Sequence, residues 1–152
     1  MPTRNASARW SGDLRSGRGS FLSASAARRT GTLRRPAVAG AFNFGSRFEE
    51  GPGANPEELI AAAEAACFTM ALCAALEKAG KPAVLVQTDA ACTIEEVPEI
   101  GYTITRLLLT VRALAPGVDS ESFAQAAELT RAHCTVSRAL AGVVIDLDAA
   151  LA

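Results

Sequence analysis

The strongest pattern of hydrophobic positions is a long apolar segment in the middle of the chain, bounded by residues that start and stop helices. Asn55 is a good helix cap, Pro56 is favoured at the first helical position, and Gly80 is typical of a helix end. The pattern therefore predicts a helix over residues 56–79. Between residues 65 and 76 this helix is apolar on every side, which is typical of a central helix that is enclosed all round.

Shorter segments on both sides of this helix alternate between polar and apolar positions, as strands do. Turn residues separate two such segments near the N-terminus, which predicts a hairpin. The even-numbered phenylalanines from Phe42 to Phe48 would lie on one face of a strand that ends the segment 1–50. The remaining elements are expected, in chain order, as strands over 83–114, helices over 120–140 and a last strand over 143–148.

Together these elements predict an α+β fold in a single domain that spans residues 1–152. The length of 152 residues is close to the common size of one domain. A helix that is apolar on all sides is difficult for one chain of this size to enclose. The pattern therefore also favours a dimer.

The charged residues are unevenly distributed along the chain. Residues 1–47 contain nine arginines and one acid, whereas residues 48–152 contain six basic and fifteen acidic residues. A basic, serine-rich start is typical of transit peptides and of nucleic-acid-binding arms. However, three glycines from Gly12 to Gly19 oppose an amphipathic helix, and the acidic remainder offers no basic binding face. We therefore expect a folded basic segment and no nucleic-acid partner.

The apolar runs and the cysteines indicate the compartment. The longest uncharged apolar run has twelve residues, whereas a membrane-spanning helix needs about 20, so no membrane insertion is expected. Four cysteines without an apolar signal sequence are typical of a reducing compartment, which predicts a cytoplasmic protein. The cysteines form no C-x-x-C pair and His133 is the only histidine, so we expect no metal site.

Two cysteines are candidates for thiol chemistry. Cys67 lies in the middle of the apolar helix, where its nearest charge is Glu64, and the pattern alone favours an inert core thiol. Because burial raises a thiol pKa, a reactive Cys67 needs a cation from elsewhere, and Arg47 is a candidate. Cys134 follows His133 at a helix end, where it is either a second thiol or a residue without a function.

Several segments of the chain resemble one known family. They are residues 8–13 and 17–20, the run 43–49 that contains Arg47, the run 55–72 that contains Cys67, and the segments 101–105, 115–119 and 134–137. In their order and spacing they are similar to the osmotically inducible protein C (OsmC) and organic hydroperoxide resistance (Ohr) family, on its OsmC branch. The resemblance covers most of the chain.

The resemblance implies a fold and an activity. The fold would have antiparallel sheets around a long buried central helix, in an intertwined homodimer. The activity would be a thiol-dependent peroxidase that reduces organic hydroperoxides, and hydrogen peroxide more weakly, to alcohols in oxidative and osmotic stress defence. It implies no bound cofactor and no metal, with electrons from an external dithiol reductant protein of lipoyl or other thiol type.

The resemblance also implies four site residues. Cys67 would be the peroxidatic thiolate, and Cys134 would be the resolving thiol that condenses with the sulfenic acid. Arg47 would lower the pKa of Cys67 and polarise the peroxide, while Glu57 would hold Arg47 in place. On a straight helix Glu57 lies about 15 Å from Cys67. Either the helix bends, or Arg47 and Glu57 reach Cys67 across the dimer interface, and we favour the second arrangement.

The chain departs from the family pattern near its second cysteine. The family usually has proline after this cysteine, whereas Thr135 follows Cys134 here, and we expect the regained N–H and freer backbone to make this segment more mobile. Cys73 and Cys92 have no role in the family and are expected in the core. Two other functions stay open for such a chain, namely a redox sensor and a binding protein for small apolar ligands on the same fold.

Overall fold

The computed structural model describes residues 4–23 and 36–152, which divide into two compact units, residues 1–56 and 57–152. Each unit is described by itself. Residues 1–3 and 24–35 of the expected basic segment lie outside the described residues. A single domain over residues 1–152 stays a prediction.

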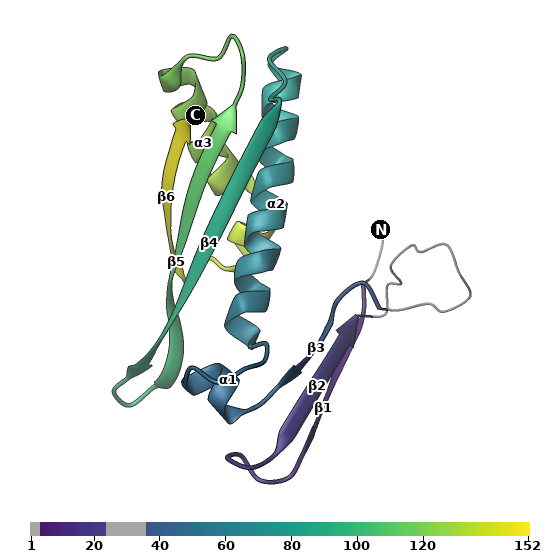
Figure 1. Cartoon of the computed structure of the whole chain (residues 1–152). Helices are drawn as coiled ribbons and strands as arrows, with labels where there is room; N and C mark the ends of the chain where they lie inside the picture. The colour runs from purple at the N-terminus through teal and green to yellow at the C-terminus, as the bar shows by residue number, and fades with distance from the viewer. Residues whose placement is uncertain (1–3, 24–35) are drawn as a thin grey trace, which may run out of the picture. The chain divides into compact units, whose positions relative to one another are not determined.

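The first unit contains a three-stranded antiparallel sheet in the order β1-β2-β3 (Figure 1). Its strands are β1 (Ala6–Ser11), β2 (Arg18–Ser23) and β3 (Ala39–Phe42). The Phe42 ring lies over Gly19, where a Cβ atom would come within 2.4 Å of it, and its centroid is 5.6 Å from that of Trp10. The hairpin expected near the N-terminus is therefore present, and glycine in β2 makes room for an aromatic side chain of β3.

The prediction that a strand continues through residues 41–49 is wrong in its second half. The strand β3 ends at Phe42, and a short helix, α1 (Phe44–Phe48), follows. Asn43 caps this helix, because its Oδ1 accepts from the Ser46 N–H at 3.1 Å while the Ser46 Oγ accepts from the Asn43 N–H at 3.0 Å. This reciprocal capping box turns the chain out of the sheet.

The second unit contains the sheet β4-β5-β6. Its strands are β4 (Leu85–Val97), β5 (Gly101–Leu114) and β6 (Val144–Leu151). The expected antiparallel pairing holds for β4 with β5, whereas β6 pairs parallel to β5. The reason is the connection, because α3 (Ser120–His133) and α4 (Thr135–Ala139) carry the chain back along the sheet before β6 begins.

The long helix α2 (Pro56–Lys78) lies on the same face of this sheet as α3 (Figure 1). It ends as the sequence predicts, because Gly80 has φ +74° and the Lys81 N–H donates to the carbonyl of Leu76 at 3.0 Å. One stripe of α2 is buried, and its members are Glu57, Ala61, Glu64, Phe68, Leu72 and Leu76. The apolar members pack with alternate residues of β5, such as Leu109 and Val111, and with Phe123 of α3.

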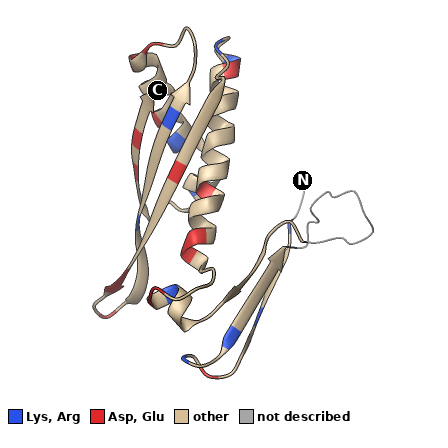
Figure 2. Ribbon diagram, in the orientation of Figure 1, with Lys and Arg blue, Asp and Glu red and all other residues tan. Residues whose placement is uncertain are grey.

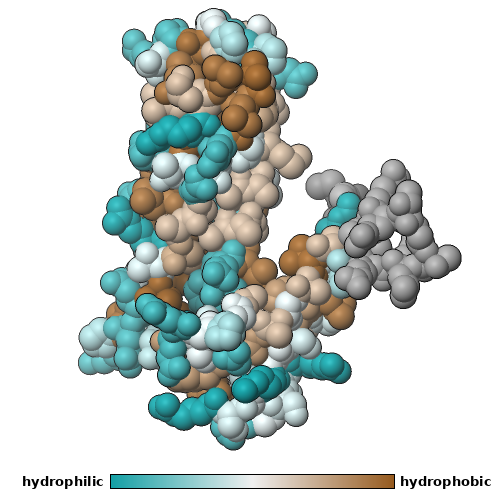
Figure 3. All heavy atoms as spheres, viewed as in Figure 1, coloured by the Kyte–Doolittle hydropathy of each residue, from teal (hydrophilic) through white to brown (hydrophobic). Residues whose placement is uncertain are grey.

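The expected enclosure of α2 on every side is not found in the single chain. Met70 is 75% exposed, and the visible side of α2 is mostly an apolar surface (Figure 3). The physical reason is that one sheet and one helix cover only one side of a long helix. By length and composition α2 also resembles a membrane span, but core helices of soluble proteins pass the same test. Its buried stripe, packed on the sheet, identifies it as a core helix.

Candidate active site

The fold of the second unit brings Cys67 and Cys134 together. Cys67 lies in the middle of α2 and is half-buried, whereas Cys134 stands at the junction of α3 and α4 and is 2% exposed. The backbone N–H of Cys134 donates to the carbonyl of Thr130 at 2.7 Å, which fixes the end of α3. The two thiols interact by a hydrogen bond. The pairing that the sequence analysis expects between these two cysteines is thus possible in this structure.

The surroundings of Cys67 favour its neutral thiol. Burial raises the pKa of the Cys67 thiol, the neighbouring Cys134 raises it further, and the amide N–H groups of Val136 and Thr135 oppose the change. The basic residue of α2 is Lys78, in its last turn, and the middle of the helix carries no blue in Figure 2. Within the described residues of this unit, none of the main influences on Cys67 is a cation.

The surroundings of Cys134 favour its thiolate. Burial alone would raise the pKa of Cys134, but the Ser137 amide, the Cys67 thiol and the Ser137 hydroxyl together hold it below its ordinary value. The two Ser137 groups belong to the start of α4, where backbone N–H groups lack partners inside the helix, whereas the Cys67 thiol comes from α2. In this unit taken alone, Cys134 therefore ionises more readily than Cys67.

Thr135 takes part in this arrangement through its backbone. It occupies the first position of α4, directly after the cap residue Cys134, and its N–H contributes to the thiolate form of Cys67. A proline at this position has no N–H to donate. The departure from the family pattern thus adds a hydrogen-bond donor beside the thiol pair, a consequence that differs from the mobility expected from the sequence.

The other two predicted site residues, Arg47 and Glu57, lie in α1 and at the start of α2. Arg47 is exposed in α1 of the first unit, where its guanidinium lies 5.0 Å from the Phe48 ring centroid. Glu57 is buried in the first turn of α2. Because α2 runs without interruption, Glu57 lies about 15 Å along its axis from Cys67. The bend considered from the sequence is therefore not found.

The other two cysteines are only partly in the core. Cys73 and Cys92 are both half-buried. Burial raises the pKa of the Cys92 thiol, and the negative charge of Glu57 raises it further, so Cys92 is kept in its unreactive form. Cys92 faces the start of α2 from β4, whereas Cys73 lies beyond Cys67 on α2.

Two polar residues next to the thiol pair were not singled out as site residues by the sequence analysis. Glu64, three positions before Cys67, is 0% exposed, and Ser137, three positions after Cys134, is 6% exposed. The Ser137 hydroxyl donates to Glu64 Oε1 at 2.5 Å. A signal for Glu64 existed in the sequence, since an acid one turn before a cysteine in an apolar helix needs a partner, but the partner comes from a distant segment.

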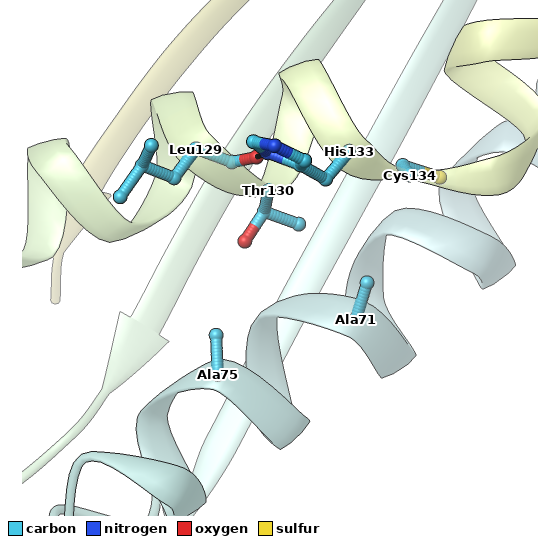
Figure 4. Close-up of a pocket in the computed structure, with 6 residues that line it drawn as sticks. All are labelled: Ala71, Ala75, Leu129, Thr130, His133 and Cys134. Carbon is cyan, nitrogen blue, oxygen red and sulfur yellow. Dashed lines mark hydrogen bonds between the residues drawn. The ribbon is translucent and has the colours of Figure 1, made fainter.

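An apolar hollow lies beside Cys134 between α2 and α3 (Figure 4). Its volume is about 250 Å³, and it is lined by Ala71, Ala75, Leu129, Thr130, His133 and Cys134. The His133 Nδ1 is 2.8 Å from the carbonyl of Leu129, and its ring is turned along α3 away from the Cys134 sulfur. The hollow has room for a small apolar group next to the thiol pair.

Known proteins resemble this chain over nearly its whole length. It is 36% identical to the peroxiredoxin OsmC of Escherichia coli K12 over 140 residues, which cover 91% of each protein. The solved organic hydroperoxide resistance protein of Elizabethkingia anophelis matches with a TM-score of 0.74 at 21% identity, covering 100% of this chain and 98% of that one. The corresponding protein of Bacillus subtilis matches with a TM-score of 0.72 at 20% identity, covering 97% of each.

These likenesses confirm the expected α+β fold. A family model for OsmC-like protein also matches residues 49–148, a segment that contains both Cys67 and Cys134. Together with the identity to the E. coli peroxiredoxin, this match agrees with the resemblance seen in the sequence. The chain belongs to the OsmC-like protein family.

Proposed function

We propose that this chain is a thiol-dependent peroxidase that reduces organic hydroperoxides, with Cys67 as the attacking thiol and Cys134 as the resolving thiol. The observation that carries the proposal is the meeting of these two thiols from α2 and the α3–α4 junction. The relatives support it, since the E. coli relative is named a peroxiredoxin and the solved relatives are named for resistance to organic hydroperoxides.

The reaction needs two chemical steps at the thiol pair. In the first, the Cys67 thiolate attacks the distal oxygen of the hydroperoxide, the O–O bond breaks, and the leaving alkoxide takes a proton to become the alcohol. In the second, the thiolate of Cys134 attacks the sulfenic sulfur of Cys67, a disulfide forms, and hydroxide leaves as water after protonation. The substrate oxygen is reduced, and the two cysteines are oxidised.

The first step requires a cation that the second unit does not supply to Cys67. We propose Arg47 for this role, because its guanidinium stays protonated and can donate to a thiolate and a carboxylate together. Glu57 would orient Arg47. The homodimer that we propose would let these residues reach Cys67 from a partner subunit, and the exposed apolar side of α2 would be part of that interface.

The shared site is tested by mixing Cys67→Ser subunits with Arg47→Ala subunits. If the site is shared across the interface, each heterodimer has one site with neither change, so activity returns after subunit exchange. If each site lies within one chain, every site in the mixture carries a change and activity stays lost. Subunit exchange is verified by native mass spectrometry.

The hollow beside Cys134 supports an organic substrate. Four of its six lining residues are alanine, leucine or cysteine side chains, which suit an alkyl or aryl group and gain nothing from hydrogen peroxide. We therefore propose that organic hydroperoxides react faster than hydrogen peroxide. The reductant would be an external dithiol, of lipoyl or other thiol type, and no bound cofactor is needed for the steps above. A cytoplasmic location stays a prediction from the sequence.

The function is tested by turnover of cumene hydroperoxide and of hydrogen peroxide, driven first by dithiothreitol and then by a lipoyl system. Turnover that prefers the organic peroxide supports the proposal. Oxidation of Cys67 in a single round without turnover would favour a redox sensor. Binding of the peroxide's alcohol product with no oxidation of Cys67 would favour an apolar-ligand protein.

A further inference from the structure

Glu64 is an unusual residue in the buried stripe of α2. It is 0% exposed, and every other member of that stripe beyond the first turn is apolar. Its Oε1 accepts the hydrogen bond from the Ser137 hydroxyl at 2.5 Å, whereas its Oε2 is buried with no hydrogen-bond partner in the part of the chain that the structure describes. A buried carboxyl oxygen without a partner is costly, so its retention here points to a role beyond packing.

The position of Glu64 connects the two elements that carry the thiols. It stands one turn before Cys67 on α2, and its partner Ser137 stands at the third position of α4, whose cap residue is Cys134. At the start of a helix, the side chain of the third residue can reach back toward the cap residue. The Ser137 hydroxyl accordingly interacts with the Cys134 thiol. Ser137 therefore lies between Cys134 and Glu64.

A serine hydroxyl in this place can pass on a proton. It has one hydrogen to donate and two lone pairs to accept with. In the thiol form of Cys134, Ser137 donates to Glu64 and its oxygen can accept the proton of the Cys134 thiol. In the thiolate form, the Ser137 hydroxyl donates to the Cys134 sulfur instead, which is how it lowers the pKa of that thiol. When that proton moves to Ser137 and the hydroxyl proton moves to Glu64, Cys134 becomes a thiolate and Ser137 is unchanged.

We propose that Glu64, acting through Ser137, accepts the proton that Cys134 releases when it attacks oxidised Cys67. The inference rests on the proposed function and adds a base to its second step. The new bond joins the two sulfur atoms, and the S–O bond of the Cys67 sulfenic acid breaks. Hydroxide leaves into solvent, and the proton that the carboxylic acid of Glu64 later returns to solvent neutralises it, so that the net product is water. Glu64 is thus a positioning and proton-accepting residue that touches neither sulfur.

The other titratable groups around the thiol pair fit this role less well. Arg131 and Arg138 share a surface hollow of about 240 Å³ with Ser137, but a guanidinium does not accept protons. His133 precedes Cys134, yet its ring is turned toward Leu129 and away from the Cys134 sulfur (Figure 4). His133 is the competing base that the experiment must exclude.

The test compares the two steps separately in the full-length protein after one equivalent of cumene hydroperoxide. Glu64→Gln keeps the size of the side chain and an oxygen that accepts from Ser137, but removes the carboxylate. We expect the rate at which Cys67 is oxidised to stay within about twofold, while disulfide formation slows about a hundredfold at pH 7 and the sulfenic acid accumulates. Trapping of the sulfenic acid and mass spectrometry follow both species.

Two controls separate this role from a structural one. Glu77→Gln changes an exposed acid near the far end of α2 and is expected to leave both rates unchanged. Raising the pH should restore disulfide formation in Glu64→Gln, because Cys134 then ionises without a base, whereas a distorted site would stay slow at every pH. Ser137→Ala should show the same slow second step and decides the question if Glu64→Gln fails to fold.

Three outcomes overturn the proposal. The first is disulfide formation at the wild-type rate in both Glu64→Gln and Ser137→Ala. The second is a similar loss in His133→Asn, which would make His133 the base. The third is a wild-type protein that does not react with the hydroperoxide, and this result alone would also reject the proposed function. A wild type that forms the disulfide, with variants that form it equally fast, rejects only the role of Glu64.

Discussion

The two units of the chain differ in how much core they possess. In the second unit, Phe68, Leu109, Val111 and Phe123 are each fully buried among the residues of α2, β5 and α3. In the described part of the first unit no apolar side chain is fully buried, and β1 is exposed along its whole length. Its phenylalanines, such as Phe21 and Phe42, are half-buried, and Trp10 is exposed.

In the proposed mechanism, one unit positions the two thiols and the other unit activates Cys67. The well-packed unit fixes Cys67 and Cys134 next to each other, and its own groups make Cys134 the more acidic thiol. The weakly packed unit carries Arg47, the cation that the proposed mechanism needs at Cys67. In the proposed mechanism the well-packed unit supplies the reacting atoms, and the weakly packed unit would supply the charge that reverses the order in which the thiols ionise.

The largest expected effect comes from removing the proposed attacking thiol. Cys67→Ser should lower peroxidase turnover at least about a thousandfold, because a serine hydroxyl is not deprotonated near neutral pH. Cys73→Ser, a change on the same helix that also affects a half-buried thiol, is the matched control and should keep turnover within about twofold. Comparable activity in the two variants would reject the role of Cys67. Turnover is measured with dithiothreitol and cumene hydroperoxide.

The difference in core is tested by removing one aromatic ring from each unit. Phe68→Ala should lower the free energy of unfolding by about 3–5 kcal/mol, because it leaves a cavity where the side chain is 0% exposed. Phe21→Ala, in the half-buried sheet of the first unit, should cost less than about 2 kcal/mol. Urea denaturation of both variants checks the comparison. Equal costs would mean that the first unit is packed as tightly as the second.

The activating role of the first unit is tested at Arg47. Arg47→Ala should raise the pKa of Cys67 and slow its oxidation at pH 7 at least about tenfold, because an adjacent cation favours the thiolate. Arg47→Lys should fall between wild type and Arg47→Ala but nearer the latter, since lysine lacks the planar fork. Glu57→Gln should have a smaller effect. The thiol pKa is measured by the pH dependence of alkylation, and no change in Arg47→Ala would exclude the arginine.

How far the sequence predicts this molecule depends on whether the decisive contacts are local. The limits of α2 follow from Asn55, Pro56 and Gly80, which act within a few residues, and the structure has them. The short helix α1 was also encoded locally, by Asn43 and Ser46, but the alternation of phenylalanines favoured a strand.

Features that depend on distant contacts were not predictable in the same way. The exposed side of α2 follows from how much of it one sheet covers, which its apolar sequence does not specify. The meeting of Cys67 with Cys134 was expected only through the family resemblance. The bond from Ser137 to Glu64 joins segments 73 positions apart, so nothing near Glu64 in the sequence indicates it.

The smallest expected effect concerns Thr135, which follows Cys134 at the start of α4 and whose N–H acts on Cys67. Thr135→Pro restores the residue that the family usually has there. Cys134 already has φ −55° and ψ 133°, a conformation that precedes proline without strain, and proline is favoured at the first position of a helix. The fold should therefore be kept, which isolates the loss of one N–H group.

That N–H favours the Cys67 thiolate, so its removal should raise the pKa of Cys67 further. At a pH below the thiol pKa, a higher pKa leaves a smaller fraction of Cys67 as the thiolate. We therefore expect Cys67 in Thr135→Pro to react about two- to fivefold more slowly than in the wild type at pH 7. The difference in rate should vanish at a pH well above the Cys67 pKa of both proteins, since Cys67 is then a thiolate in each. Thr135→Ala, which keeps the N–H, should match the wild type. A Thr135→Pro variant with an unchanged pH profile would show that the N–H of Thr135 does not act on Cys67.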